Sequence, residues 1–255
     1  MKKPKILFYD IETTPLLAWV WSTGEQYIGH HQLHKDRNMW DIICITYCYN
    51  DGKPAKHIDF DYNKQDSKKL IQEFDKLVAD ADIVIGKNNK RFDDKMVNAI
   101  RMFHDLPCDA SWIRYTGDLE KQMRKHFRLP SQSLDYISNK LGFGGKIPMV
   151  MQDWIDIVTR HPERGLKAFK KMIKYGKKDI LDTRNLWNYL EKHFEPILHV
   201  GLLQDDEALR CRACGSEKLH YHDMRGTGLT MYYRYNCQDC GFRNKTTSKA
   251  PKKMS

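Results

Sequence analysis

The chain has 255 residues, of which 41% are hydrophobic and 30% charged, a composition that fits a globular protein with one sizeable domain and a small module, or with two domains. Its formal net charge of +10 favours a polyanionic partner, most commonly nucleic acid. No apolar run approaches the roughly 18 residues of a membrane span, and the N-terminal residues lack the apolar region and cleavage site of a signal peptide. These features predict a cytoplasmic protein without a membrane partner.

Three strands are expected in the first quarter of the chain. Residues 4–11 form a short, apolar and aromatic-rich run, which is typical of a buried strand. A second strand is expected over 40–49, and the turn residues 50–54 lead to a third near 56–60, so the pattern predicts an antiparallel hairpin arrangement. The segment Trp19–Trp40 is either the edge of a substrate site or a packed loop.

The middle of the chain alternates strand and helix patterns. Residues 82–86 are apolar and end at a glycine, as expected of a buried strand. Apolar residues at helical spacing predict helices over 66–80, 92–104, 117–127, 133–141 and 164–193. A hairpin sheet followed by a strand–helix alternation predicts a mixed α/β layer architecture, in which helices flank a mixed sheet.

A domain boundary is expected near 200–210, where an acidic segment separates the last long helix from Cys211. We therefore assign residues 1–204 to a first domain and residues 205–255 to a small second domain with a basic tail. About fifty residues bury little apolar surface, so the second domain is expected to need a bound metal as a staple.

The first predicted strand ends in a pair of acids, Asp10 and Glu12. Positions two apart on a strand point to the same face, so both carboxylates can reach one metal site. By itself this pair could equally be two exposed acids at the end of a strand.

Two further segments carry acids in suggestive contexts. Asp93 closes a segment that begins at Gly86, with Asp94 as a rival ligand beside it. Tyr175 and Asp179 are four residues apart on a predicted helix and so share one face, while Asp182 is a rival one turn later. Taken alone, such a helical pair is more often an ordinary surface feature.

Together these segments resemble the DEDD superfamily of 3′→5′ exonucleases, the DnaQ-like branch of the ribonuclease H-like fold. The first family motif matches residues 8–13, the second matches 86–93, and the third matches 175–179. The tyrosine in the third motif marks the tyrosine subclass, because the histidine subclass would have histidine where Lys174 stands. Residues 133–142 resemble the family's helix before the third motif. The resemblance spans roughly 4–195 and is strongest to stand-alone relatives, in phages and bacteria, of the exonuclease domain of family B DNA polymerases.

The resemblance implies a two-metal site. Two Mg²⁺ or Mn²⁺ ions would be held by Asp10, Glu12, Asp93 and Asp179, and Tyr175 would help to orient the attacking water. Neighbouring motif positions would shape the substrate groove or contact the strand: Thr13, Asn88, Arg91 and Phe92.

The function that follows from the resemblance is 3′→5′ exonuclease activity, most simply on single-stranded DNA. A 3′→5′ exoribonuclease is the alternative, because the tyrosine subclass also contains ribonuclease D-like proteins. A further alternative is a nucleic-acid-binding module that keeps the fold without catalysis. The expected partners are single-stranded DNA or RNA, together with proteins of replication or repair.

Four of the seven cysteines form two matched turns, Cys211–Gly215 and Cys237–Gly241, with 22 residues between the pairs. Two Cys-x-x-Cys pairs at this spacing suit one tetrahedral structural Zn²⁺, held by Cys211, Cys214, Cys237 and Cys240. A redox dithiol would not explain two matched pairs, and His220 or His222 in place of one cysteine is a lesser alternative.

The cysteine module resembles a zinc ribbon, with a strand expected over 229–236. Its segment 232–235 and Phe242 interleave aromatic and basic residues, which is typical of a surface that stacks single-stranded bases. The alternative is a small core with a solvated basic face. The other three cysteines are expected to be ordinary thiols: Cys44, Cys48 and Cys108.

Overall fold

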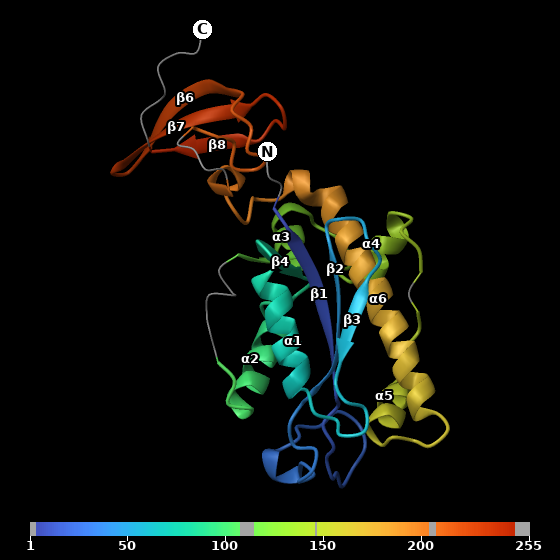
Figure 1. Ribbon diagram of the computed structural model, residues 1–255. Helices are drawn as coiled ribbons and strands as arrows, with labels where there is room; N and C mark the ends of the chain where they lie inside the picture. Colours follow the sequence, from blue (N-terminus) through green and yellow to red (C-terminus); the bar gives the residue numbers. More distant parts are fainter. Residues whose placement is uncertain (1–3, 108–114, 146, 204–207, 248–255) are drawn as a thin grey trace. The chain divides into compact units, whose positions relative to one another are not determined.

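The computed structural model describes residues 4–107, 115–145, 147–203 and 208–247 (Figure 1). The chain separates into two compact units, of which Ile6–Trp187 form the larger. Asn188 and the residues after it form the smaller unit, together with the first five residues. The boundary expected between residues 204 and 205 lies outside the described residues and stays a prediction.

The larger unit is built on a five-stranded mixed sheet in the order β3-β2-β1-β4-β5. The first three strands are antiparallel neighbours, as the hairpin pattern predicts: β1 (Ile6–Thr13), β2 (Ile42–Tyr49) and β3 (Lys56–Asp59). On the other side of β1, β4 (Ile83–Gly86) and β5 (Thr116–Asp118) run parallel to it and to each other. The predicted fold, a mixed sheet with flanking helices, is confirmed.

The helices that lie wholly or mainly in this unit are α1 (Lys68–Ala79), α2 (Asp93–Phe103), α3 (Leu119–His126), α4 (Leu134–Lys140), α5 (Met151–Val158) and α6 (Gly165–Leu190). Helix α5 was not predicted, whereas the others correspond to predicted helices. The helix expected from residue 117 begins at Leu119, because residues 116–118 pair with β4 as a strand. Asp118 then caps the helix by accepting a hydrogen bond from the Lys121 backbone amide. The expected end at residue 193 is a separate 3-10 turn, η3 (Glu191–His193).

The two faces of β1 meet different helices. Tyr9 packs against Phe74 of α1, with ring centroids 5.0 Å apart, and shares a buried cluster with residues of α2. Phe8 points the other way and meets Trp187 of α6 edge to face at 6.5 Å. Because successive strand residues alternate between faces, Asp10 and Glu12 share the Phe8 side, which α6 covers (Figure 1).

The smaller unit contains an antiparallel sheet of three strands in the order β6-β7-β8. They are β6 (Leu219–Thr227), β7 (Thr230–Cys237) and β8 (Arg243–Thr246), and β7 corresponds to the strand expected over 229–236. The described residues also form the 3-10 turns η1 (His30–Gln32) and η4 (Val200–Leu203). Within the described residues, no helix combines the length and apolar character needed to cross a bilayer.

Candidate metal centres

The first pair of acids lies in the middle of the sheet. Asp10 is paired with Thr46 of β2, and Glu12 is paired with Cys44. The two acids are two positions apart on β1, so both carboxylates stand on the same face of the sheet. The register shifts between Glu12 and Thr13, which places Thr13 at an irregular end of β1.

Asp93 reaches β1 from the start of α2. Strand β1 pairs with β4 from Ile6 to Phe8, so the Ile11 backbone amide lies beyond the last paired residue. This amide instead donates a hydrogen bond to Asp93 Oδ1 at 3.3 Å. The Asp93 side chain is only 4% exposed, and its carboxylate is therefore fixed beside the two acids of the strand.

The turn before α2 is held by specific local contacts. Asn88 adopts a left-handed conformation with φ of 63°, and its backbone amide donates to Asp118 Oδ1 at 3.0 Å. At Gly86 a Cβ atom would lie 2.6 Å from the Cβ of Asn89, so the turn requires glycine there. Asp118 was not identified from the sequence, although it ends a short strand and directly precedes a helix, as an N-cap should.

The neighbouring acid, Asp94, points to a different place. The Tyr9 hydroxyl donates to Asp94 Oδ1, and Asn89 Nδ2 donates to the same oxygen at 3.3 Å. Both donors lie in the buried interior behind β1. Asp94 is therefore hydrogen-bonded on the side of β1 opposite to the side that carries Asp10.

Helix α6 approaches this face closely at one glycine. A Cβ on Gly176 would lie 2.7 Å from Thr46 Cγ2 and 3.0 Å from its hydroxyl oxygen, and Thr46 stands opposite Asp10. The neighbouring positions of the helix are Tyr175 and Asp179, which hydrogen-bond to each other. The rival acid Asp182 is instead ion-paired with Lys178 on the same helix.

The four carboxylates act on one another electrostatically. Burial raises the pKa of Asp10 well above its ordinary value, and the charges of Asp93, Glu12 and Asp179 raise it further. The pKa of Tyr175 is raised by burial and then by the charges of Asp179 and Glu12. These side chains therefore lie close enough to one another for their charges to shift the pKa values of Asp10 and Tyr175.

Asp93 has a pKa of about 7, against an ordinary value of 3.8. Burial is the main cause and outweighs the backbone amides of Asp93 and Ile11, which favour the charged form. Asp94 and Asp118 contribute further negative charge nearby. A buried carboxylate among other carboxylates is destabilised when ionised unless a cation lies beside it.

The donor set fits hard divalent cations. Carboxylate oxygens are the ligands that Mg²⁺ and Mn²⁺ prefer, and Asp10, Glu12, Asp93 and Asp179 could hold them. Lys87 also lowers the pKa of Asp10, but its ammonium is 2.9 Å from Glu120 and is shared with that carboxylate. Among the described residues, the cysteines described below form the group of possible ligands whose atoms all lie within 4.8 Å of one another, and the four carboxylates do not reach that spacing.

Three of the four residues expected to contact substrate lie just before Asp93 in the chain. Phe92 immediately precedes α2 and is 44% exposed, although it is a large apolar side chain. Arg91 is also exposed, whereas Asn88 is half-buried in the turn and Thr13 is half-buried at the end of β1.

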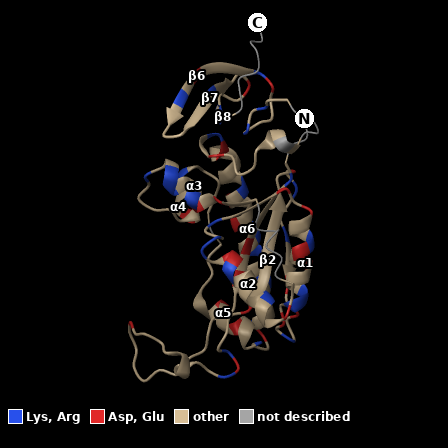
Figure 2. Cartoon of the chain, turned by 90° about the vertical axis from the view of Figure 1, so that its left-hand side faces the viewer, with Lys and Arg blue, Asp and Glu red and all other residues tan. Residues whose placement is uncertain are grey.

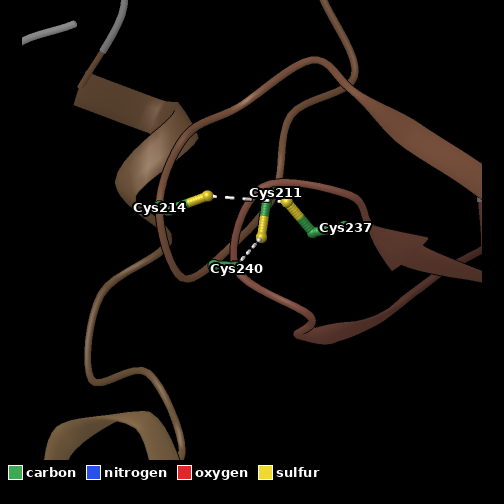
Figure 3. Close-up of side chains that lie close together, drawn as sticks. All are labelled: Cys211, Cys214, Cys237 and Cys240. Atoms are coloured by element: carbon green, nitrogen blue, oxygen red, sulfur yellow. Dashed lines mark hydrogen bonds between the residues drawn. The ribbon is translucent and has the colours of Figure 1, made fainter.

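The four cysteines of the smaller unit converge on one point (Figure 3). The Cys211 and Cys240 sulfurs are 3.6 Å apart, as are those of Cys214 and Cys237. Sulfurs around a tetrahedral zinc, with Zn–S bonds of about 2.3 Å, lie roughly 3.8 Å from each other. The cluster therefore has the size and ligand type for one Zn²⁺.

The two cysteine turns have the same construction. The Gly215 amide donates to the Cys211 carbonyl and the Gly241 amide to the Cys237 carbonyl, each at 2.9 Å. Both glycines are left-handed, with φ of 78° and 73°, which explains why each Cys-x-x-Cys pair is followed by glycine. Cys44 and Cys48 are buried thiols elsewhere in the chain, and Cys108 lies outside the described residues.

Comparison with known proteins adds one finding about the fold. No family model matches the sequence, and no curated protein matches it. Among solved structures the chain is similar to the family B DNA polymerase from the hyperthermophilic archaeon Pyrobaculum calidifontis, with a TM-score of 0.54 and 15% sequence identity. The match covers 75% of this chain and 25% of the polymerase chain, so this chain corresponds to about a quarter of that protein. At this identity the similarity concerns the fold.

Proposed function

We propose that this chain is a metal-dependent 3′→5′ exonuclease that hydrolyses the terminal phosphodiester of single-stranded DNA by a two-metal-ion mechanism. The observation that carries the proposal is the convergence on Asp10 of the charges of Glu12, Asp93 and Asp179, so that carboxylates from β1, α2 and α6 meet there. The two rival acids support this choice, because Asp94 is engaged by Tyr9 and Asp182 by Lys178.

Each residue has a definite task in this mechanism. Asp10, Glu12, Asp93 and Asp179 would hold two Mg²⁺ or Mn²⁺ ions, which when bound activate water and stabilise the leaving 3′ oxygen. Tyr175 keeps its proton at neutral pH, because the ordinary pKa of a tyrosine is about 10. Once Asp179 binds an ion, this hydroxyl would turn from Asp179 and donate a hydrogen bond that orients the attacking water, and as a protonated phenol it would not serve as the general base.

Nucleic acid is favoured as the substrate by charge and by exposed aromatic surface. Phe92 offers a partly exposed ring next to Asp93, where a terminal base could stack. A cavity of about 530 Å³ lies at the end of α3 and is lined in part by Arg124, Lys125 and Arg128. Figure 2 shows Lys and Arg concentrated on this helix. Proteins of replication or repair are the partners that fit such an activity, and the cytoplasm is the proposed location.

The proposal is tested by replacing single carboxylates with the isosteric amide. Asp10→Asn and Asp179→Asn are each expected to lower Mg²⁺-dependent hydrolysis of a labelled oligonucleotide by roughly 100-fold or more. Each replaces a charged ligand of the ions that would stabilise the transition state. Asp182→Asn is the matched control on the same helix and should keep activity within about threefold. Thermal melting checks that all three variants fold. Full activity in Asp10→Asn or Asp179→Asn would overturn the assignment.

A further inference from the structure

The smaller unit contains a cavity of about 390 Å³ that neither candidate metal centre explains. Its lining comes from His199, from the first cysteine turn and the residues just before it, including Arg210 and Arg212, and from strands β6, β7 and β8. Two hydrogen bonds hold these parts together, from the Val200 amide to the Arg212 carbonyl at 2.9 Å and from the Arg212 amide to Asn244 Oδ1 at 2.8 Å. The cavity is thus a built feature of the zinc-ribbon unit, and its volume lies in the usual range of ligand pockets, about 300–1,000 Å³.

The walls of this cavity carry positive charge and no described acidic side chain. The lining includes Arg210, Arg212 and Lys245. Arg210 is ion-paired with Glu217, so Arg212 and Lys245 are the cations best placed to meet an anion. A phosphate group is the ligand that two such cations would favour.

Two polar atoms in the cavity wall lack partners. Tyr235 is only 3% exposed, and its hydroxyl makes no hydrogen bond within the described structure. His199 Nδ1 is likewise a buried atom without a hydrogen-bond partner in the described structure. Buried polar atoms are normally satisfied, so these two atoms indicate a polar ligand or ordered water in the cavity.

One wall of the cavity is aromatic. The Lys245 ammonium lies over the Tyr232 ring, 5.5 Å from its centre, so this wall combines a cation with a flat aromatic surface. Aromatic side chains beside cations are the usual means of binding single strands, with stacking worth about 1–3 kcal/mol per base.

We infer that this cavity binds one nucleotide of a single-stranded nucleic acid, with the base against Tyr232 and the phosphate beside Arg212 and Lys245. The hydroxyl of Tyr235 supplies a hydrogen bond to the polar edge of the nucleotide. The inference rests on the proposed function only in taking a nucleic acid as the ligand, and it requires no catalysis. The smaller unit would then bind the nucleic acid at a site distinct from the four carboxylates.

The test measures binding of a fluorescein-labelled 20-residue oligothymidylate to the full chain carrying Asp10→Asn, by anisotropy across a series of KCl concentrations. Tyr232→Ala should raise Kd roughly fivefold or more, whereas Tyr232→Phe, which keeps the ring, should stay within about twofold. Arg212→Gln should raise Kd at every salt concentration and reduce the slope of log K against log salt by about one.

Lys192→Gln is the matched control, because it removes one exposed positive charge from the same unit outside the cavity. It should leave Kd within about twofold. Zinc content and melting temperature show whether each variant is folded, and Lys245→Gln replaces Arg212→Gln if that chain fails to fold. Equal weakening by Lys192→Gln, or unchanged binding in both Tyr232→Ala and the cation variant, would overturn the inference. Hydrolysis by the chain with Asp10 intact tests the carboxylate site separately, so either proposal can fail alone.

Discussion

Asp93 and Asp94 are consecutive carboxylates whose surroundings differ. Asp93 accepts a hydrogen bond from the Ile11 amide at the edge of β1, whereas Asp94 accepts hydrogen bonds from Tyr9 and Asn89 in the interior. A substitution at each position should therefore have different consequences, on metal binding at Asp93 and on packing at Asp94.

The raised pKa of Asp93 makes the stability of the metal-free protein depend on pH. Between pH of about 4 and 7 the folded chain holds a proton on Asp93 that the unfolded chain has already lost. The contribution of Asp93 to the free energy of unfolding therefore falls as pH rises through this window. Added Mn²⁺ should reverse the trend, because ions bind the ionised carboxylates and stabilise the folded state more at pH 8 than at pH 5.

Calorimetric melting of the wild type and Asp93→Asn at pH 5, 6, 7 and 8 checks this prediction. The variant cannot ionise at that position, so the difference in melting temperature between the two metal-free proteins should change in its favour as pH rises. A difference that stays constant with pH would contradict the assigned pKa shift.

Some residues of the candidate site follow from local sequence patterns, and others depend on contacts between distant parts of the chain. The strand alternation at Asp10 and Glu12 and the helical spacing at Tyr175 and Asp179 are local patterns, and the sequence could therefore identify them. The choice between Asp93 and Asp94 depends on the Tyr9 hydroxyl, which is 85 residues from Asp94 in the chain. No local pattern encodes such a contact, so both acids had to remain candidates.

At the scale of elements, the close approach of α6 to β2 depends on Gly176. Alanine there places a methyl group against Thr46, which is 1% exposed and has little room to move. We expect Gly176→Ala to cost about 1–3 kcal/mol of stability through overpacking. It should also lower hydrolysis by about 10- to 100-fold, because Tyr175 and Asp179 move away from β1.

A second substitution separates crowding from other effects of alanine. Thr46→Ala removes the two atoms that the new methyl group would meet, leaving the Thr46 Cβ at 3.4 Å. The double variant Gly176→Ala/Thr46→Ala should therefore recover most of the lost activity. An equally poor double variant would show that Gly176 acts in another way.

Long periodic elements were predictable, and very short ones were not. The helix over Lys68–Ala79 buries residues at regular spacing, which the sequence displays directly. The strand Thr116–Asp118 has three residues and is defined by its parallel pairing with β4, a long-range relation without a periodic signal. Strand β6 was missed because its residues are mostly exposed and polar, so it lacks the alternation expected of a half-buried strand.

At the scale of the whole molecule, the cysteine cluster should be necessary for the smaller unit. A sheet of three short strands buries little apolar surface, so loss of the zinc ligands is expected to unfold it. In the full chain, Cys211→Ser/Cys214→Ser should reduce zinc content from about one ion per chain to near zero. It should also weaken oligonucleotide binding and flatten its dependence on salt.

Elemental analysis and anisotropy measure these two effects. Cys48→Ala is the control, because it removes a buried thiol outside the cluster and should leave the zinc content unchanged. Full zinc content in the double serine variant would refute the four-cysteine site. Loss of zinc with unchanged oligonucleotide binding would show that the ribbon only stabilises the chain.

The central claim is that the carboxylates of β1, α2 and α6 cut nucleic acid from its 3′ end. The most direct measurement is a time course with Mg²⁺ on a 20-residue single-stranded DNA labelled at its 5′ end, beside the same strand labelled at its 3′ end and an RNA of the same sequence. The account predicts a ladder of 5′-labelled DNA that shortens one nucleotide at a time, and immediate release of the 3′ label as a mononucleotide, with Asp10→Asn inactive on both. Release of the 5′ label first, internal cuts, or the same products from Asp10→Asn would contradict it.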